Sequence, residues 1–201
     1  RSAIPCYFVS RLAAEHVKVI MTGEGADEIF AGYTYYADID DDERLHRELL
    51  RSVKSLHNIN LQRVDRLTMA HSLEGRVPFL DLKMVELAQT VPPELKLFTE
   101  RDGRRTEKWI LRKACEDLLP AEITWRRKEQ FDEGSGTADI MGDLLAAGMS
   151  ASQAAAYRSV HAESRLRSAE ECTYHQLLCD AYDDPQTILA NVARWTDRPA
   201  A

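Results

Sequence analysis

Residues 17–33, VKVIMTGEGADEIFAGY, are the strongest indication of fold in this chain. A short apolar run at residues 17–21 leads directly into two glycines and three acids, Glu24, Asp27 and Glu28. An apolar run preceded by an amphipathic helical segment at residues 4–16 is typical of one crossover in a parallel sheet. Ligands of such sheets bind beyond the carboxyl ends of the strands. The three acids therefore stand where a ligand is expected.

The rest of the chain reads as helices. Helical spacing of apolar residues predicts helices at 40–58, 60–74, 81–91, 103–119, 138–148, 162–182 and 185–195. One strand cannot satisfy its own backbone hydrogen bonds, so its partners lie outside this chain or are hidden in it. We expect an α/β protein that is mostly helical within this chain. Residues 150–156, SASQAAA, are interpreted as a flexible joint, and the expected core includes Met69, Leu73, Phe79 and Leu80.

Composition excludes several classes of protein. The 201 residues are 44% hydrophobic and 29% charged, which is ordinary for a globular protein. A net charge of -7 argues against a broad nucleic-acid-binding surface. No apolar run approaches the roughly 18 residues that a membrane span needs, and the first residues lack a signal-peptide pattern. We therefore expect a cytoplasmic protein with no membrane contact, and its four cysteines to be reduced, mostly buried thiols.

The acids after the predicted strand permit two interpretations. Gly23 and Gly25 let a ligand approach the main chain, and the following helix N-terminus favours anions. Acids there repel phosphate unless a cation intervenes, which suggests Asp27 as a ligand of Mg2+ and Glu24 as a proton acceptor. Alternatively, Asp27 and Glu28 are helix N-terminal acids that the helix dipole stabilises by about 0.3–1 kcal/mol each.

Two further segments are unusual. Residues 73–81, LEGRVPFLD, read as a helix end, a glycine and a proline turn, with Asp81 as the N-cap of a new helix. Residues 125–136, WRRKEQFDEGSG, place three bases before two glycines. A charge run is usually a solvated surface, but bases beside a glycine-rich loop also suit a lid over phosphates.

Four motifs, in this order and at these separations, resemble the synthetase domain of glutamine-hydrolysing asparagine synthetases. They are VIMTGEGADEIFAGY, NLQRVDRLTMAHSLEGRVPFLD, EKWILRKACEDLLPAEI and WRRKEQFDEG. The resemblance implies the C-terminal, helix-rich part of an adenine-nucleotide alpha-hydrolase-like (Rossmann-like) domain. Residues 1–136 would form a partial synthetase domain, and residues 137–201 a helical extension of it.

The resemblance also implies a reaction. ATP adenylates the side-chain carboxylate of L-aspartate and releases pyrophosphate, and ammonia from glutamine then displaces AMP to give asparagine. By position, the resemblance assigns catalysis to Glu24 and Lys128, with Lys128 on the pyrophosphate side. It assigns Mg2+ to Asp27. Nucleotide contacts fall on Thr22, Gly23 and Gly25, and substrate contacts on Arg63, Asn60 and Glu28.

This sequence also departs from the family pattern. The phosphate loop SGGxDS and the glutaminase domain are absent, so we expect the chain to be inactive without them, or to need a separate polypeptide that carries the loop. Asn60 replaces an aspartate found in many members, which puts recognition of the substrate ammonium in doubt. The open alternatives are a related adenylating cyclase, a β-lactam or macrolactam synthetase, and a non-catalytic helical binding module.

Overall fold

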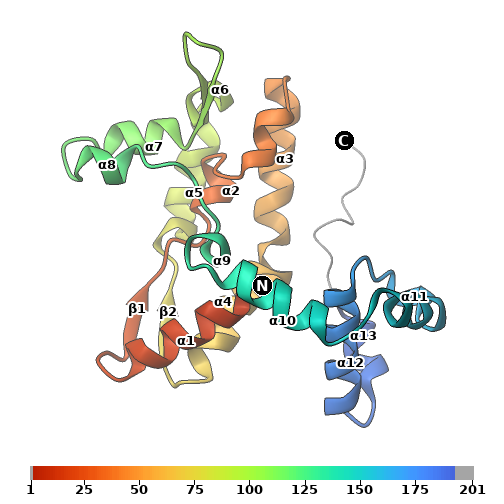
Figure 1. The fold of residues 1–201 in the computed structure, drawn as a ribbon. Helices are drawn as coiled ribbons and strands as arrows, with labels where there is room; N and C mark the ends of the chain where they lie inside the picture. Colours follow the sequence, from red (N-terminus) through yellow and green to blue (C-terminus); the bar gives the residue numbers. More distant parts are fainter. Residues whose placement is uncertain (1, 193–201) are drawn as a thin grey trace. The chain divides into compact units, whose positions relative to one another are not determined.

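The computed structural model describes residues 2–192, which divide into two compact units (Figure 1). One unit comprises residues 6–129, and the other comprises residues 2–5 with residues 130–192. The predicted site residues, from Thr22 to Lys128, all belong to the first unit. The mostly helical α/β class that the sequence predicts is confirmed.

The first helix, α1, begins at Ala3, so its first three residues are assigned to the other unit. The first unit consists of helices and short strands. Its elements are α1 (Ala3–Ala14), β1 (Val19–Met21), α2 (Ala26–Ile29), η1 (Thr34–Asp38), α3 (Asp42–Ser55), η2 (Leu56–Asn58), α4 (Asn60–Met69), β2 (Glu74–Arg76), η3 (Pro78–Leu80), α5 (Leu82–Thr90), α6 (Pro93–Lys96), β3 (Leu97–Thr99), β4 (Arg105–Glu107), α7 (Trp109–Ala114) and α8 (Ala121–Thr124).

The predicted strand has a partner strand within this chain, which the sequence did not reveal. β1 pairs in parallel with β2, Val19 opposite Glu74 and Met21 opposite Arg76, and the two strands lie side by side in Figure 1. The helix predicted to run to residue 74 was wrong at its end, because α4 stops at Met69. Gly75 allows the close packing of α4 on β2, since a Cβ there would lie 3.1 Å from Cγ1 of Val64.

A second strand pair was also missed. β3 and β4 are antiparallel, with Leu97 opposite Glu107 and Thr99 opposite Arg105. The helix predicted from residue 103 therefore begins only at Trp109, whose ring stacks on Phe98 with centroids 4.5 Å apart. After β4 the chain continues directly into α7, whose start lies next to the site described below.

The core of the first unit follows the predicted helical pattern around α3. Leu45 and Leu49 are fully buried, as is Leu73. Met69 was expected in the core, but its side chain is 57% exposed because it ends α4 on the outer face. The apolar strand β1 is exposed as well, with Met21 at 79%, so the strand pair shows apolar side chains to solvent.

The second unit is helical. Its elements are α9 (Phe131–Gly134), α10 (Thr137–Ala147), α11 (Ala151–Val160), η4 (Ala162–Ser164), α12 (Ala169–Ala181) and α13 (Pro185–Leu189). The flexible joint predicted at 150–156 was wrong, because Ser150 and Gln153 form a capping box that starts α11. None of the four cysteines forms a disulfide among the described residues, and only Cys172 is buried, whereas most were expected to be buried. No described helix has the length and apolarity needed to cross a membrane.

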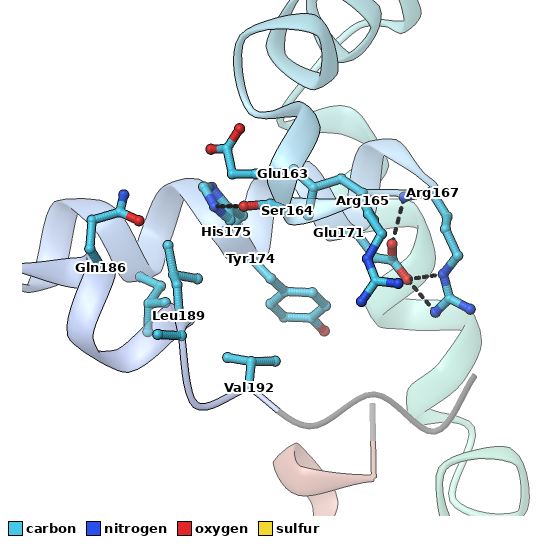
Figure 2. A pocket seen from close by; sticks show the side chains of 13 residues that line it. Glu163, Ser164, Arg165, Arg167, Glu171, Tyr174, His175, Gln186, Leu189 and Val192 are labelled. Carbon is cyan, nitrogen blue, oxygen red and sulfur yellow. Dashed lines mark hydrogen bonds and ion pairs between the residues drawn. The ribbon is translucent and has the colours of Figure 1, made fainter. Parts of the chain in front are cut away.

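The second unit contains a cavity of about 850 Å³, whose lining side chains are drawn in Figure 2. Arg167 and Glu171 form an ion pair at its edge, and Ser164 lies within hydrogen-bonding distance of His175. None of the site residues predicted from the sequence lines this cavity. Size alone therefore does not locate the functional site.

Lys96, at the end of α6, allows a test of the packing in the first unit. Its side chain is fully buried, and Nζ has no hydrogen-bond partner among the described residues. Burial lowers the pKa of the Lys96 ammonium from 10.5 to about 8. The charged form therefore destabilises the fold at pH 7, and this cost disappears as the pH rises from about 8 to 10.5.

We expect Lys96→Met to raise the free energy of unfolding at pH 7 by about 3 kcal/mol, since one pKa unit corresponds to about 1.4 kcal/mol. Urea unfolding at pH 7 and pH 10 measures this effect, and the stability of the parent chain should rise between these pH values while that of the variant stays flat. Lys113→Met, at an exposed position on α7, is the control and should change neither value. A Lys96→Met variant less stable than the parent at pH 7 would contradict the account.

Candidate active site

The acids follow β1 on a tight turn into α2. Gly25 is the N-cap of this short helix and has a φ of +93°, a conformation that favours glycine. A Cβ at this position would also lie 2.3 Å from Cδ2 of Leu80. Asp27 and Glu28 lie in the first turn of α2, so the helix dipole favours both of them. Their side chains nevertheless make specific contacts of their own.

Asp27 lies between two lysines from distant parts of the chain. Nζ of Lys108 is 2.7 Å from Oδ1 of Asp27, and Nζ of Lys128 donates to Oδ2 at 3.0 Å. Burial alone would raise the pKa of Asp27, but attraction to the two ammonium groups outweighs it and lowers that pKa below its ordinary value. Asp27 is therefore a carboxylate at neutral pH, with a cation on each oxygen.

Lys108 was not singled out by the sequence, although it lies inside the motif EKWILRKACEDLLPAEI. Its backbone has a φ of +53°, which costs free energy for a residue with a Cβ. Two contacts stabilise this conformation, because its N–H donates to the carbonyl of Phe30 and its ammonium pairs with Asp27. No local pattern reveals such a residue, since both contacts are with a segment about 80 positions earlier.

Glu24 and Arg63 form a second ion pair. Nη2 of Arg63, on α4, donates to Oε1 of Glu24 at 2.7 Å, and both side chains are mostly buried. Burial opposes the charge of Arg63, but attraction to Glu24 outweighs it and raises the pKa of Arg63. Nε of Arg63 is buried without a hydrogen-bond partner in the described residues.

Glu28 lies in a buried polar cluster with Tyr33 and Asn60. Oε1 of Glu28 accepts from the Tyr33 hydroxyl at 2.5 Å and from Nδ2 of Asn60 at 2.8 Å. Burial raises the pKa of Glu28 and also that of Tyr33. Tyr33 was not among the predicted site residues. The structure thus brings Glu28 and Asn60 into direct contact, and both side chains are buried.

The three predicted nucleotide contacts lie at the carboxyl end of β1. The N–H of Thr22 extends the ladder by donating to the carbonyl of Arg76 at 2.8 Å. Gly23 borders open space, because a Cβ there would have no atom within 4 Å. Gly25 instead faces Leu80. The predicted N-cap at Asp81 is confirmed, since its side chain accepts from the N–H of Lys83, and Asp81 is thus structural.

Asp27 is the residue to which the sequence assigned a metal ion. Within residues 2–192, no three side chains of histidine, cysteine, aspartate or glutamate gather to form a metal site. Both oxygens of Asp27 already contact a lysine ammonium, Oδ1 that of Lys108 at 2.7 Å and Oδ2 that of Lys128 at 3.0 Å. Magnesium commonly takes one or two protein carboxylates and completes its shell with phosphates and waters. Asp27 fits that more limited role if the ion displaces one of its two lysines.

These residues lie at the carboxyl end of β1, which is the position where α/β nucleotide-binding proteins carry their ligand sites. The sequence matches the family model described as asparagine synthase over residues 1–40 and 37–195. The chain therefore belongs to the asparagine synthase family.

Individual relatives named as asparagine synthetases support this assignment to the family. Asparagine synthetase [glutamine-hydrolyzing] 1 of Saccharomyces cerevisiae is 37% identical over 208 residues, which cover 97% of this chain and 36% of the relative. The probable asparagine synthetase of Schizosaccharomyces pombe is 36% identical and covers 98% of this chain and 37% of its own length. The Triphysaria versicolor asparagine synthetase is 44% identical over 71% of this chain and 25% of its own length. The chain thus spans between a quarter and somewhat over a third of these relatives.

Gly32 offers a test of the Asp27 ion pairs. A Cβ on Gly32 would lie 2.0 Å from Oδ1 of Asp27 and 2.2 Å from Cε of Lys108. We expect Gly32→Ala to separate this ion pair and to destabilise the fold by about 1–3 kcal/mol, the usual cost of overpacking. Thermal unfolding followed by circular dichroism measures the effect. Gly23→Ala is the matched control, because its new methyl group would enter open space; equal melting temperatures for the two variants would contradict the packing described here.

Proposed function

We propose that this chain is part of an ATP-dependent amide ligase that converts L-aspartate to asparagine through β-aspartyl-AMP. One observation carries the proposal: two lysines surround the Asp27 carboxylate, in the same unit as the Glu24–Arg63 ion pair at the end of β1. Adenylation brings a carboxylate and a polyphosphate together, and cations in the site lower that electrostatic barrier. The names of the relatives support the same reaction.

Arg63 would bind the substrate's α-carboxylate. A guanidinium suits a bidentate carboxylate. Its existing partner Glu24 would then lie beside the bound substrate. Attack by ammonia produces a cationic intermediate that must lose a proton, and Glu24 would accept it. The Glu24–Arg63 contact at 2.7 Å supports these paired roles.

Asp27 and Lys128 would serve the phosphate side. Asp27 would supply one oxygen ligand to Mg2+, which when bound would neutralise phosphate charge. Lys128 would stabilise the charge that develops on the departing pyrophosphate, since its ammonium has three donors and only one is used on Asp27. ATP would contact the backbone at Thr22, Gly23 and Gly25.

Other parts of the reaction would lie outside this chain. Ammonia would come from glutamine, as the names of the relatives imply, and a further segment or a separate polypeptide would supply a phosphate loop. The buried cluster of Glu28, Tyr33 and Asn60 would support the site from within, because its hydrogen bonds hold α2 against the start of α4. We place the reaction in the cytoplasm.

A chimaera tests this function. The matching segment of the Saccharomyces cerevisiae relative is replaced by this chain, and formation of AMP and asparagine from ATP, aspartate and ammonia is measured. We expect activity with aspartate, and a loss of at least about 100-fold in asparagine formation for Glu24→Gln, the usual contribution of a proton-transfer residue. Glu43→Gln, at an exposed position on α3, is the control. A soluble chimaera that adenylates another acid, or that is unaffected by Glu24→Gln, would refute the proposal.

A further inference from the structure

The second unit carries a serine and a histidine in the arrangement of a nucleophile and its base. Oγ of Ser164, the last residue of η4, lies 2.9 Å from Nε2 of His175 on α12. Both residues are buried, at 8% and 6% exposure, and both line the cavity of about 850 Å³ (Figure 2). The proposed ligase reaction does not use this pair. A hydroxyl within hydrogen-bonding reach of an imidazole is the geometry that activates a serine for attack on a carbonyl carbon.

A third side chain orients the histidine. The hydroxyl of Tyr157, on α11, lies 2.9 Å from Nδ1 of His175, nearer than Sγ of Cys179 at 3.7 Å. The rings of Tyr157 and His175 also meet edge to face, with centroids 5.7 Å apart. In the tautomer with a proton on Nδ1, that N–H donates to Tyr157, and Nε2 accepts from Ser164. His175 is thus positioned to take the proton of the serine hydroxyl.

The backbone at the serine is fixed by a tight turn. The N–H of Ser164 donates to the carbonyl of His161 at 3.0 Å, and the N–H of Arg165 donates to that of Ala162 at 3.1 Å. Arg165 has a φ of +47°, which is unfavourable for a residue with a Cβ and occurs mainly where the structure around a functional site enforces it. The hydroxyl of Ser164 therefore belongs to a rigid turn that faces the base.

The cavity restricts what can reach this pair. Its volume lies within the range of about 300–1,000 Å³ that is usual for small-molecule pockets. Two arginines and two glutamates line it, so its wall has no net charge: Arg165, Arg167, Glu163 and Glu171. The apolar part of the wall consists of Leu166, Leu178, Leu189, Ala190 and Val192. The cavity therefore suits an uncharged molecule with an apolar body.

We propose that Ser164 and His175 hydrolyse uncharged carboxylic esters with a short apolar acyl chain. Oγ of Ser164 forms a bond to the ester carbonyl carbon while its proton passes to Nε2 of His175. The bond from that carbon to the alcohol oxygen then breaks, and His175 gives the proton to the departing alcohol. Water attacks the acyl-serine, a proton returns through His175 to Ser164, and the carboxylic acid leaves. Arg165, which lines the cavity, supplies positive charge for the oxyanion.

Hydrolysis of p-nitrophenyl butyrate by this chain, followed by release of p-nitrophenolate, tests the proposal. We expect Ser164→Ala to lose at least about 100-fold in kcat/KM, the usual contribution of such a group. Ser159→Ala is the control, because this exposed serine on α11 bonds only the carbonyl of Ala155 and does not line the cavity. Equal rates for Ser164→Ala and the parent chain would overturn the proposal. The assay does not involve ATP or aspartate, so its result is independent of the proposed ligase function.

A covalent label identifies the nucleophile in the parent chain, whatever the stability of the variants. A fluorophosphonate forms a bond from phosphorus to an activated serine oxygen with loss of fluoride, and peptide mass spectrometry locates the modified residue. We expect the label on Ser164. An unlabelled Ser164 after complete reaction would refute the proposal.

Tyr157 acts through His175 and is a positioning residue. Tyr157→Phe keeps the ring and removes the hydroxyl, so it should lower kcat about tenfold and leave KM unchanged, because this side chain orients the base without touching the ester. A variant with the kcat of the parent chain, or one in which only KM changes, would contradict this role.

Discussion

The ion pairs of Asp27 are the interaction on which the rest of the site depends. Asp27, Lys108 and Lys128 belong to three segments spread over a hundred residues, and their charges join the turn after β1 to the start of α7 and to the loop after α8. A buried carboxylate without such partners would be costly. With a lysine on each oxygen, it instead fixes the positions of the basic residues around it.

The backbone around this carboxylate is arranged for close approach. Lys108 has a left-handed conformation, and Gly32 is tolerated only as glycine because the Asp27–Lys108 contact occupies the space of its Cβ. Such local costs are typical of functional sites, where the surrounding structure enforces an unfavourable geometry. The same contact supports the proposed phosphate side of the reaction.

Local patterns in the sequence predicted some of this and could not predict the rest. The spacing of leucines in α3 predicts a helix, and the apolar run of β1 predicts a strand. Both patterns depend only on residues that are close in sequence. β2, with the sequence Glu74–Arg76, has no strand-like composition and exists only through its pairing with β1. Lys108 likewise owes its role to contacts across the fold. Glu24, Asp27, Arg63 and Lys128 were predictable as a set only from the family resemblance, and their roles stay predictions.

The pKa of Asp27 tests the central claim most directly, and carbon-13 NMR titration of the side-chain carboxyl groups measures it. The account predicts a pKa below the ordinary 3.8 in this chain, and a higher value in Lys108→Met. Because the folded pKa is lowered, the ion pairs contribute stability above the ordinary pKa and lose it as the pH falls through the folded value. An Asp27 pKa at or above 3.8 in the parent chain, or one that Lys108→Met leaves unchanged, would contradict the account.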